Sequence, residues 1–253
     1  MELCSLASGS KGNAYYISAQ NTEILVDNGL SIADIEKRLI AVGKDPKNIK
    51  AIFLTHEHRD HIAGVAAFCN KYNSLLFVHK RALGAVSFMT QKIANKIRTF
   101  DTADFYFESL TVSPFETSHD AAYPVAFSFY SLGKKVTILT DTGEVTPEMI
   151  AAIEGSTAIV LEANHDTRML LLGDYPAKLK RRIKGREGHL SNEDAAEVAK
   201  TLVHTGTKIV ILGHLSEKNN FPEIAKACVY DSVGDLCELY VANQQEPTKI
   251  FNI

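Results

Sequence analysis

Three histidines and one aspartate lie within six consecutive positions of the chain, from His56 to His61. Residues 51–54, before them, form a short apolar run with β-branched and aromatic side chains, which is typical of a buried strand. Residues 62–72, after them, have apolar side chains at the spacing of a helix. The sequence therefore predicts that the polar cluster lies on a loop between a strand and a helix, where functional side chains are displayed on a rigid scaffold.

The spacing of these four residues predicts metal ligands. His56 and His58 are two positions apart and point the same way if the chain is still extended there. Asp60 and His61 follow where the chain turns, so one loop can supply a pair of ligands to each of two metal ions. Imidazole and carboxylate suit zinc, manganese or iron. The alternative, a loop of solvated histidines, is disfavoured because these side chains would repel one another when protonated.

The composition is that of an ordinary globular protein, with 45% hydrophobic and 23% charged residues among 253. The formal net charge is −3, so the molecule as a whole has no attraction for nucleic acid, and such binding needs a local basic patch. The four cysteines contain no CxxC pair, which favours buried thiols over a disulfide framework. No signal-peptide pattern and no apolar run of membrane-spanning length is found, so the expected location is the cytoplasm, without membrane contact.

One segment supplies a basic patch, because residues 178–186 contain six Lys or Arg residues. The candidates for binding a phosphate backbone are Lys180, Arg181, Arg182 and Lys184. The alternative is a solvated helix face, which is the usual meaning of a charge run. Tyr175 is the nearest aromatic residue and the chain has no tryptophan, so base-specific readout is not expected.

Four further polar residues share one context, because each follows a predicted strand. These residues are His119, Asp141, His165 and His214. A histidine taken singly is more often a satisfied structural residue than a ligand. Strand ends that meet at one edge of a fold, however, assemble a site from distant segments. Asp27 also follows a predicted strand, and it is either a turn residue or a group that orients a ligand histidine.

Groups of strands followed by helices occur twice, with no Pro/Gly/Ser-rich linker between the two halves. This pattern predicts one domain over residues 1–253, with two sheets face to face and helices outside. Among the helices, one is expected over residues 80–98. Ser31 and Ser191 are expected to cap two others.

The segment from His56 to His61 resembles the HxHxDH signature of the metallo-β-lactamase-fold hydrolases. The resemblance implies an α+β fold, the four-layer αββα sandwich. It also implies two divalent metal ions, Zn or Mn, bridged by Asp141. The other ligands that it implies are His56, His58 and His119 for the first ion and Asp60, His61 and His214 for the second. His165 has no place in that pattern.

A closer resemblance, to the YycJ (WalJ) subfamily, covers nearly the whole chain. It rests on SGSKGN at residues 8–13, EANHD at 162–166, LKRRI at 179–183, GHLSN at 188–192 and GHLSEKNN at 213–220. The subfamily implies a metal-dependent DNA nuclease akin to the 5′-to-3′ exonucleases of the fold. Related nucleases carry a β-CASP domain between the bridging aspartate and the last histidine. Here those residues are 73 positions apart (214 − 141), which leaves no room for a β-CASP insertion.

The implied mechanism is hydrolysis of a phosphodiester by a hydroxide that bridges the two ions, with Asp60 in the catalytic centre. The leaving oxygen needs a proton, for which His189 and His165 are the candidates. His189 is preferred because it adjoins the basic run and the start of a helix. In the alternative interpretation, His165 orients a ligand and His189 only closes a loop.

Two other functions remain open on the same residues. The ions could serve attack on a thioester, a lactone or a small phosphodiester, although an uncharged ester gives the basic run no purpose. The site could also bind metal for stability or regulation only. That interpretation would be favoured if His119, Asp141 or His214 lay far from the loop. The sequence does not indicate the oligomeric state.

Overall fold

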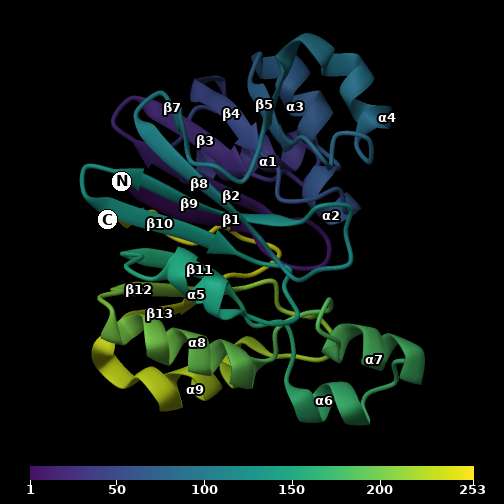
Figure 1. The fold of residues 1–253 in the computed structure, drawn as a ribbon, viewed down its shortest axis with the longest axis vertical. Helices are drawn as coiled ribbons and strands as arrows, with labels where there is room; N and C mark the ends of the chain where they lie inside the picture. Colours follow the sequence, from purple (N-terminus) through teal and green to yellow (C-terminus); the bar gives the residue numbers. More distant parts are fainter.

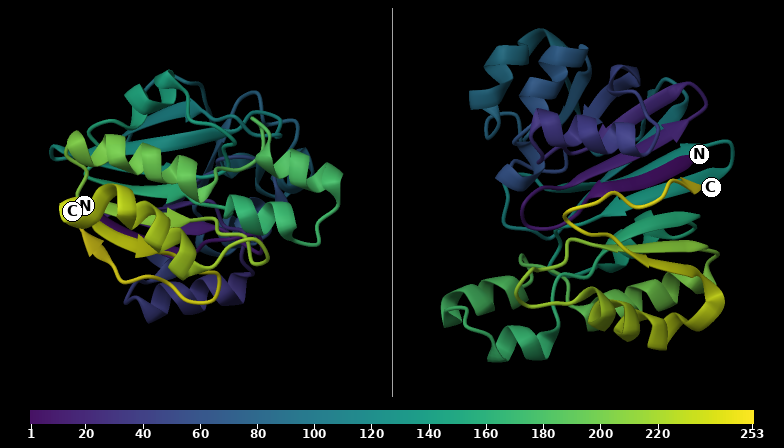
Figure 2. Two further views of the ribbon diagram at one scale, coloured as in Figure 1. Left: turned by 90° about the horizontal axis from the view of Figure 1, so that it is seen from below. Right: turned by 180° about the vertical axis from the view of Figure 1, so that it is seen from behind.

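Two β-sheets lie face to face between outer layers of helices (Figure 1). The computed structural model describes residues 1–253, apart from the side chains of Thr90 and Lys92. Both chain ends lie at the same side of the molecule (Figure 2). The four-layer αββα arrangement is therefore confirmed.

The first sheet has seven strands. In spatial order they are β14 (Phe251–Asn252), β1 (Glu2–Ala7), β2 (Ala14–Ala19), β3 (Thr22–Val26), β4 (Ile49–Phe53), β5 (Leu75–His79) and β6 (Ile97–Phe100). Strands β14 to β3 are antiparallel, and β3 to β6 are parallel. Val26 pairs with Phe53, so β3 and β4 end at the same edge. This register places Asp27 beside the loop that follows β4.

The second sheet also has seven strands. They are β13 (Glu238–Val241), β12 (Ile209–Gly213), β11 (Ala158–Glu162), β10 (Lys134–Leu139), β9 (Val125–Ser131), β8 (Leu110–Glu116) and β7 (Phe105–Phe107). Strands β10 to β13 are parallel. Leu139, Leu161 and Leu212 stand side by side at the ends of β10, β11 and β12. The polar residues that follow these strands therefore emerge at one edge.

The helices lie outside the two sheets (Figure 1). They are α1 (Ile32–Ala41), α2 (Arg59–Ile62), α3 (Val65–Tyr72), α4 (Ser87–Thr90), α5 (Pro147–Ile153), α6 (Thr167–Leu172), α7 (Ala177–Lys184), α8 (Asn192–His204) and α9 (Pro222–Val233). The Ser31 side chain accepts the N–H of Asp34, and the Ser191 side chain accepts that of Asp194. Both predicted caps are confirmed. None of the helices that the structure describes has the length and apolarity that crossing a membrane requires.

Aromatic side chains from both sheets fill the space between them. Phe53 stacks on Phe77 with 4.6 Å between ring centroids, and meets Phe129 of the second sheet edge-on at 5.4 Å. A second apolar layer lies between the second sheet and the helices α8 and α9. Because strand burial on both faces stiffens the parallel segments, the strand ends are fixed relative to one another.

The prediction of one helix over residues 80–98 is wrong. Only Ser87–Thr90 is α-helical, a 3₁₀ segment follows over Gln91–Lys96, and the chain then extends into β6. Ile97 pairs with Leu76 of β5, so the sheet takes the end of this segment. The backbone kinks at Ile93, and the apolar side chains are buried by short turns instead of one helix.

Candidate active site

The predicted loop between strand and helix is present, running from the end of β4 to α2. The ring centroids of His56 and His61 lie 4.2 Å apart, and those of His56 and His58 lie 4.6 Å apart. His56 and His61 are buried. The histidines therefore converge instead of spreading into solvent.

Backbone contacts from two neighbouring segments hold this loop. The N–H of Asn13 donates to the Asp60 carbonyl at 2.7 Å, and the N–H of Asn28 donates to the His61 carbonyl at 2.9 Å. A Cβ on Gly29 would lie 1.7 Å from the Asp60 carbonyl oxygen, so only glycine fits there. The turn before β2, through Asn13, and the turn after β3, through Asn28 and Gly29, thus position the loop.

Two groups of side chains match the ligand sets that the resemblance implies. His56, His58 and His119 offer ligand atoms that all lie within 4.8 Å of one another, and so do Asp60, His61 and His214. Asp141 lies between the groups: its Oδ2 is 3.3 Å from His61 Nε2, and its Oδ1 is 3.7 Å from His119 Nε2. The structure therefore brings all seven predicted ligands together.

Four of the histidines have Nδ1 in contact with another protein group. The contacts join His61 with Asp27 Oδ2 at 2.8 Å, His214 with Glu162 Oε1 at 2.9 Å, His119 with the Gly188 carbonyl at 3.0 Å and His56 with Thr55 Oγ1 at 3.0 Å. Such contacts fix the orientation of an imidazole and leave Nε2 available to an ion. Asp27 also accepts the N–H and the hydroxyl of Thr55, both at 2.8 Å.

The donor atoms fit a divalent cation. Nε2 of His56, Nε2 of His214 and Oδ2 of Asp141 are buried and make no hydrogen bond within the described residues. Buried polar atoms without partners are costly and therefore rare. Imidazole nitrogens and carboxylate oxygens that converge in this way form the ligand set of a zinc or manganese site.

The backbone is also constrained at the site. Asp27, Asp141 and His214 have left-handed φ angles of 59°, 59° and 56°. This conformation is uncommon for residues other than glycine, and it is retained where the surrounding structure holds the residue in place. The three residues each follow a strand, so the backbone turns sharply to direct the side chain into the site.

The electrostatics favour replacement of protons by cations. Burial disfavours the charged form of His214, but Asp141, Asp60 and Glu162 outweigh it and raise the His214 pKa to about 10. Burial also lowers the pKa of His61, but the carboxylates of Asp141 and Asp27 outweigh burial and raise this pKa well above its ordinary value. Burial would raise the pKa of Asp141, but His214 and His61 lower it well below the usual range. Asp141 is therefore ionised, and His61 and His214 hold protons that a cation would displace. Burial lowers the pKa of His56 and His119 instead, so these two imidazoles are neutral and ready to bind a cation.

Glu162 is a site residue that the sequence predictions missed. It is the last residue of β11 and is fully buried. Its Oε1 lies 2.8 Å from His189 Nδ1 and 2.9 Å from His214 Nδ1, and its Oε2 accepts the Thr142 N–H at 2.8 Å. An acidic residue at the end of an apolar strand, next to two predicted site segments, was the available signal.

The two proton-donor candidates occupy different places. His189 lines the cavity at the ligand cluster and lies 3.8 Å from Asp141, measured from Nδ1 to Oδ1. His165 is buried, its Nδ1 makes no hydrogen bond within the described residues, and it does not line that cavity. Its carbonyl accepts the N–H of Asn192 at 2.9 Å. The arrangement favours His189 as the candidate.

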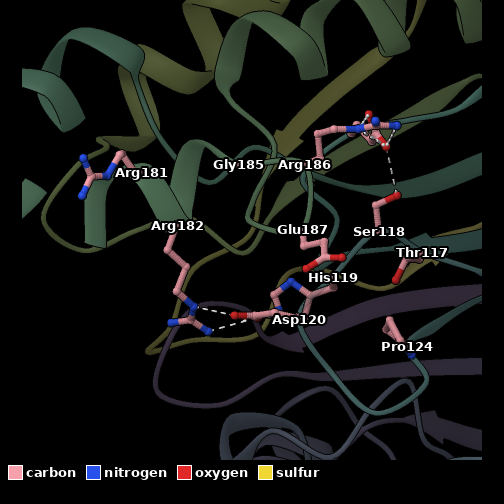
Figure 3. Close-up of a pocket in the computed structure, with 11 residues that line it drawn as sticks. Thr117, Ser118, His119, Asp120, Pro124, Arg181, Arg182, Gly185, Arg186 and Glu187 are labelled. Atoms are coloured by element: carbon pink, nitrogen blue, oxygen red, sulfur yellow. Dashed lines mark hydrogen bonds and ion pairs between the residues drawn. The ribbon is translucent and has the colours of Figure 1, made fainter. Parts of the chain in front are cut away.

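Two adjoining cavities open at the cluster, and both are lined by His119 and Arg182. The one over the ligands measures about 260 Å³. The other measures about 750 Å³ and is drawn in Figure 3. Arg181 and Arg186 also line the larger cavity, as do Asp120, Glu144 and Glu187, so its wall carries three guanidinium groups beside three carboxylates.

The predicted phosphate-binding residues divide into two pairs. Arg181 and Arg182 line the larger cavity, whereas Lys180 and Lys184 line neither cavity. Arg182 forms a two-point ion pair with Asp120, with N–O distances of 2.5 and 3.0 Å, while Arg181 extends away from it (Figure 3). Lys180 donates to the Leu171 carbonyl at 2.8 Å. The helix α7 is present, but only some of its cations line the cavities.

Comparison with known proteins is consistent with this geometry. A family model described as "Beta-lactamase superfamily domain" matches residues 22–215. The chain is 35% identical to the exodeoxyribonuclease YycJ of Bacillus anthracis, over 97% of this chain and 96% of that protein. It is 37% identical to the exodeoxyribonuclease WalJ of Streptococcus pneumoniae (strain D39), over 87% of this chain and 83% of that protein.

Among solved structures, the metallo-beta-lactamase fold protein YhfI of Bacillus subtilis matches with a TM-score of 0.75 and 15% identity, over 98% of this chain and 99% of that one. This likeness shows the fold. The fold implies binding of divalent metal, for which the clustered histidines and aspartates supply the donors. The chain belongs to the beta-lactamase superfamily and, within it, to the family of the YycJ and WalJ exodeoxyribonucleases.

Proposed function

We propose that this chain is a metal-dependent exodeoxyribonuclease that hydrolyses phosphodiester bonds at the ligand cluster. The observation that carries the proposal is the convergence of seven ligand-type side chains beside an arginine-lined cavity. Relatives at 35% and 37% identity, both named exodeoxyribonucleases, support it. Action on DNA, and cleavage from the 5′ end, are parts of the proposal.

The first ion would be held by His56, His58 and His119. The second would be held by Asp60, His61 and His214, with Asp141 bridging the two, as Zn or Mn. When bound, the two ions activate water at neutral pH and neutralise charge on the phosphate. Asp27 orients His61 through the contact at 2.8 Å, and Glu162 does the same for His214 at 2.9 Å.

His189 is the proposed donor of a proton to the leaving oxygen. Glu162 holds its Nδ1 at 2.8 Å, which leaves Nε2 to face the cavity that His189 lines. An imidazole N–H that faces the cavity can donate a proton to a leaving oxygen there, as general acid catalysis requires. His165 is not assigned this role, because it does not line the cavity.

Arg181 and Arg182 are proposed to hold the phosphate backbone in the larger cavity, with Lys180 and Lys184 adding charge on the outside of α7. Arg182 would exchange its contact with Asp120 for a phosphate oxygen. We further propose that residues 1–253 act as one domain without a β-CASP insertion. A cytoplasmic location agrees with four free thiols and stays a prediction.

The test is cleavage of 5′-labelled and 3′-labelled single- and double-stranded DNA by metal-stripped protein, with Mn²⁺ or Zn²⁺ added. His56→Ala and Asp141→Ala run beside wild type, and His204→Ala on α8 is the matched histidine control. We expect cleavage only with metal, lost in the first two variants and retained in the third. The pattern of labelled products assigns the direction of cleavage.

Absence of cleavage of any polymer, in protein shown to carry two ions per chain, would contradict the nuclease proposal. The second candidate, a hydrolase of thioesters, lactones or small phosphodiesters, would then be tested on the same protein. The arginine-lined cavity favours the anionic polymer over an uncharged ester.

A further inference from the structure

Three residues give the metal cavity an apolar wall that the proposed chemistry does not use. Leu179 and Ile183 are one helical turn apart on α7, and Tyr175 lies one turn earlier, in the connection from α6. All three line the cavity of about 260 Å³ over the ligand cluster. All three are only partly buried, although α7 is otherwise mostly polar. Apolar side chains that are not fully buried beside an active site suggest contact with an apolar part of the substrate.

The Tyr175 ring has a defined partner outside the cavity. Lys218 Nζ lies 5.5 Å from the ring centroid, and Lys218 is not among the residues that line the cavity. A cation–π contact of this kind uses the face of the ring and helps to hold its orientation. The helices α6 and α7 stand together at one end of the molecule, apart from α8 and α9 (Figures 1 and 2). Tyr175, in the connection between these two helices, lines the same cavity as the ligands.

We propose that Tyr175, flanked by Leu179 and Ile183, is the stacking platform for one unpaired nucleobase of the nucleotide whose phosphate is at the metal centre. This inference rests on the proposed nuclease function. Aromatic stacking of bases is sequence-tolerant, since every base has a π face. It would therefore select for an unpaired end without selecting for a sequence. Bases in a duplex are already stacked, so a blunt end must fray before it can enter.

The arrangement also separates two tasks. The cavity over the ligands takes the base and the phosphate under attack, while the larger cavity, lined by Arg181 and Arg186, tracks the rest of the strand. The cavity over the ligands is small, on the scale of one small ligand. A preference for single-stranded ends over blunt duplex ends follows from this geometry.

The experiment compares Tyr175→Leu, Tyr175→Phe and the control Tyr106→Leu, an exposed tyrosine on β7 that lines neither cavity. Oligonucleotides carry 2-aminopurine at one of the first four positions from either end, and phosphorothioate linkages there to slow cleavage. Fluorescence of the probe reports stacking directly, whatever the rate of hydrolysis. KM and kcat are then measured on unmodified single-stranded and blunt duplex DNA.

We expect wild type, Tyr175→Phe and Tyr106→Leu to quench the probe at one position near one end. Tyr175→Leu should lose that quenching, raise KM for single-stranded DNA by about tenfold and leave kcat within about threefold. Its metal content, measured by elemental analysis, should match wild type, which shows that the metal centre is intact. Tyr175→Met serves as the second variant if Tyr175→Leu does not fold.

Two results distinguish failure of the inference from failure of the proposed function. Quenching and KM that are unchanged in Tyr175→Leu, in a protein that cleaves DNA, would overturn the stacking platform alone. A wild-type protein that holds metal but neither binds nor cleaves any DNA would overturn the nuclease function and the platform together.

Discussion

The ligand cluster and the helix α7 face each other across the same cavity, yet they are built in opposite ways. Four ligand histidines are each at most 6% exposed: His56, His61, His119 and His214. The Nδ1 atom of each ring contacts a protein group that is not itself a ligand. The helix α7 contains no buried residue. Side chains on rigid strand ends can be held in a reactive geometry, whereas exposed side chains on a short helix adapt to a polymer that moves past them.

The charges of the two regions differ in the same way. In the cluster, Asp141 and the histidines shift one another's pKa values strongly, because they are buried and close. On α7, the pair between Arg182 and Asp120 is partly solvated, and such pairs contribute little to stability. Substitutions in the cluster should therefore abolish hydrolysis, whereas substitutions on α7 should alter the affinity for DNA.

The largest effect is expected for Asp141→Asn. Loss of the bridging carboxylate removes a charge that both ions need, so kcat/KM for DNA should fall by more than about 10⁴-fold. Elemental analysis should find fewer than two ions per chain. If the variant keeps both ions and more than a tenth of the activity, Asp141 is not a ligand of the metal site.

His189→Gln should lower kcat by about 10³-fold while KM stays near wild type, because a proton donor acts only in the transition state. Metal content should not change. The variant is best measured over pH 5 to 9, since loss of a general acid also removes one limb of the pH–rate profile. An unaltered profile would leave His189 as a loop residue only.

Metal affinity should depend steeply on pH. In the metal-free protein the pKa of His214 is raised to about 10 and that of His61 is also raised, so both hold protons at pH 7. These raised values stabilise the metal-free fold below pH about 6.5, and that contribution is lost as pH rises towards 10. Binding must displace both protons, so affinity should rise by up to about 100-fold per pH unit through neutral pH and more slowly as pH approaches 10. Calorimetry in buffers of different ionisation enthalpy counts the protons, and affinity that does not change with pH would contradict the assignment.

Glu162→Gln should cost about 10- to 100-fold in kcat/KM, the usual effect of removing a group that orients a metal ligand. Because Glu162 contacts both His189 and His214, the double variant with His189→Gln should lose less than the product of the two single effects. Full additivity in this cycle would mean that Glu162 acts independently of His189.

The smallest effect is expected for Arg181→Ala. KM for DNA should rise about threefold, and the slope of log KM against log salt should fall by about 0.7 for one lost phosphate contact. Lys200→Ala on α8 is the matched control and should change neither quantity. A large fall in kcat in Arg181→Ala would place this residue in the chemistry instead.

The same contrast explains what could be predicted from the sequence. The ligand loop is contiguous, and His119, Asp141 and His214 each follow a readable strand, so the convergence could be predicted. Glu162 was missed although it follows the same pattern, because an acid at the end of a strand gains a clear role only once its partners on other strands are known. His165 shared the strand-end context but is directed elsewhere.

The basic run could be predicted as a helix but not as a surface. Which cations face the cavity depends on the rotation of α7 about its axis, which the spacing of the charges along the sequence does not reveal. The prediction of a helix over residues 80–98 failed for a similar reason, because the pairing of β6 with β5 outweighs the helical spacing of the apolar residues. In both cases tertiary contacts decided what local pattern left open.

The central claim is that the ligand cluster carries out hydrolysis while α7 binds the DNA backbone. The triple variant Lys180→Ala/Arg181→Ala/Lys184→Ala, assayed on two substrates, tests this claim most directly. These cations have no acidic side chain as ion-pair partner in the part of the chain that the structure describes. In this variant we expect hydrolysis of bis(p-nitrophenyl) phosphate to stay within about twofold of wild type. We expect kcat/KM for single-stranded DNA to fall at least about tenfold at low salt. An equal fall on both substrates, or unchanged cleavage of DNA, would contradict the claim.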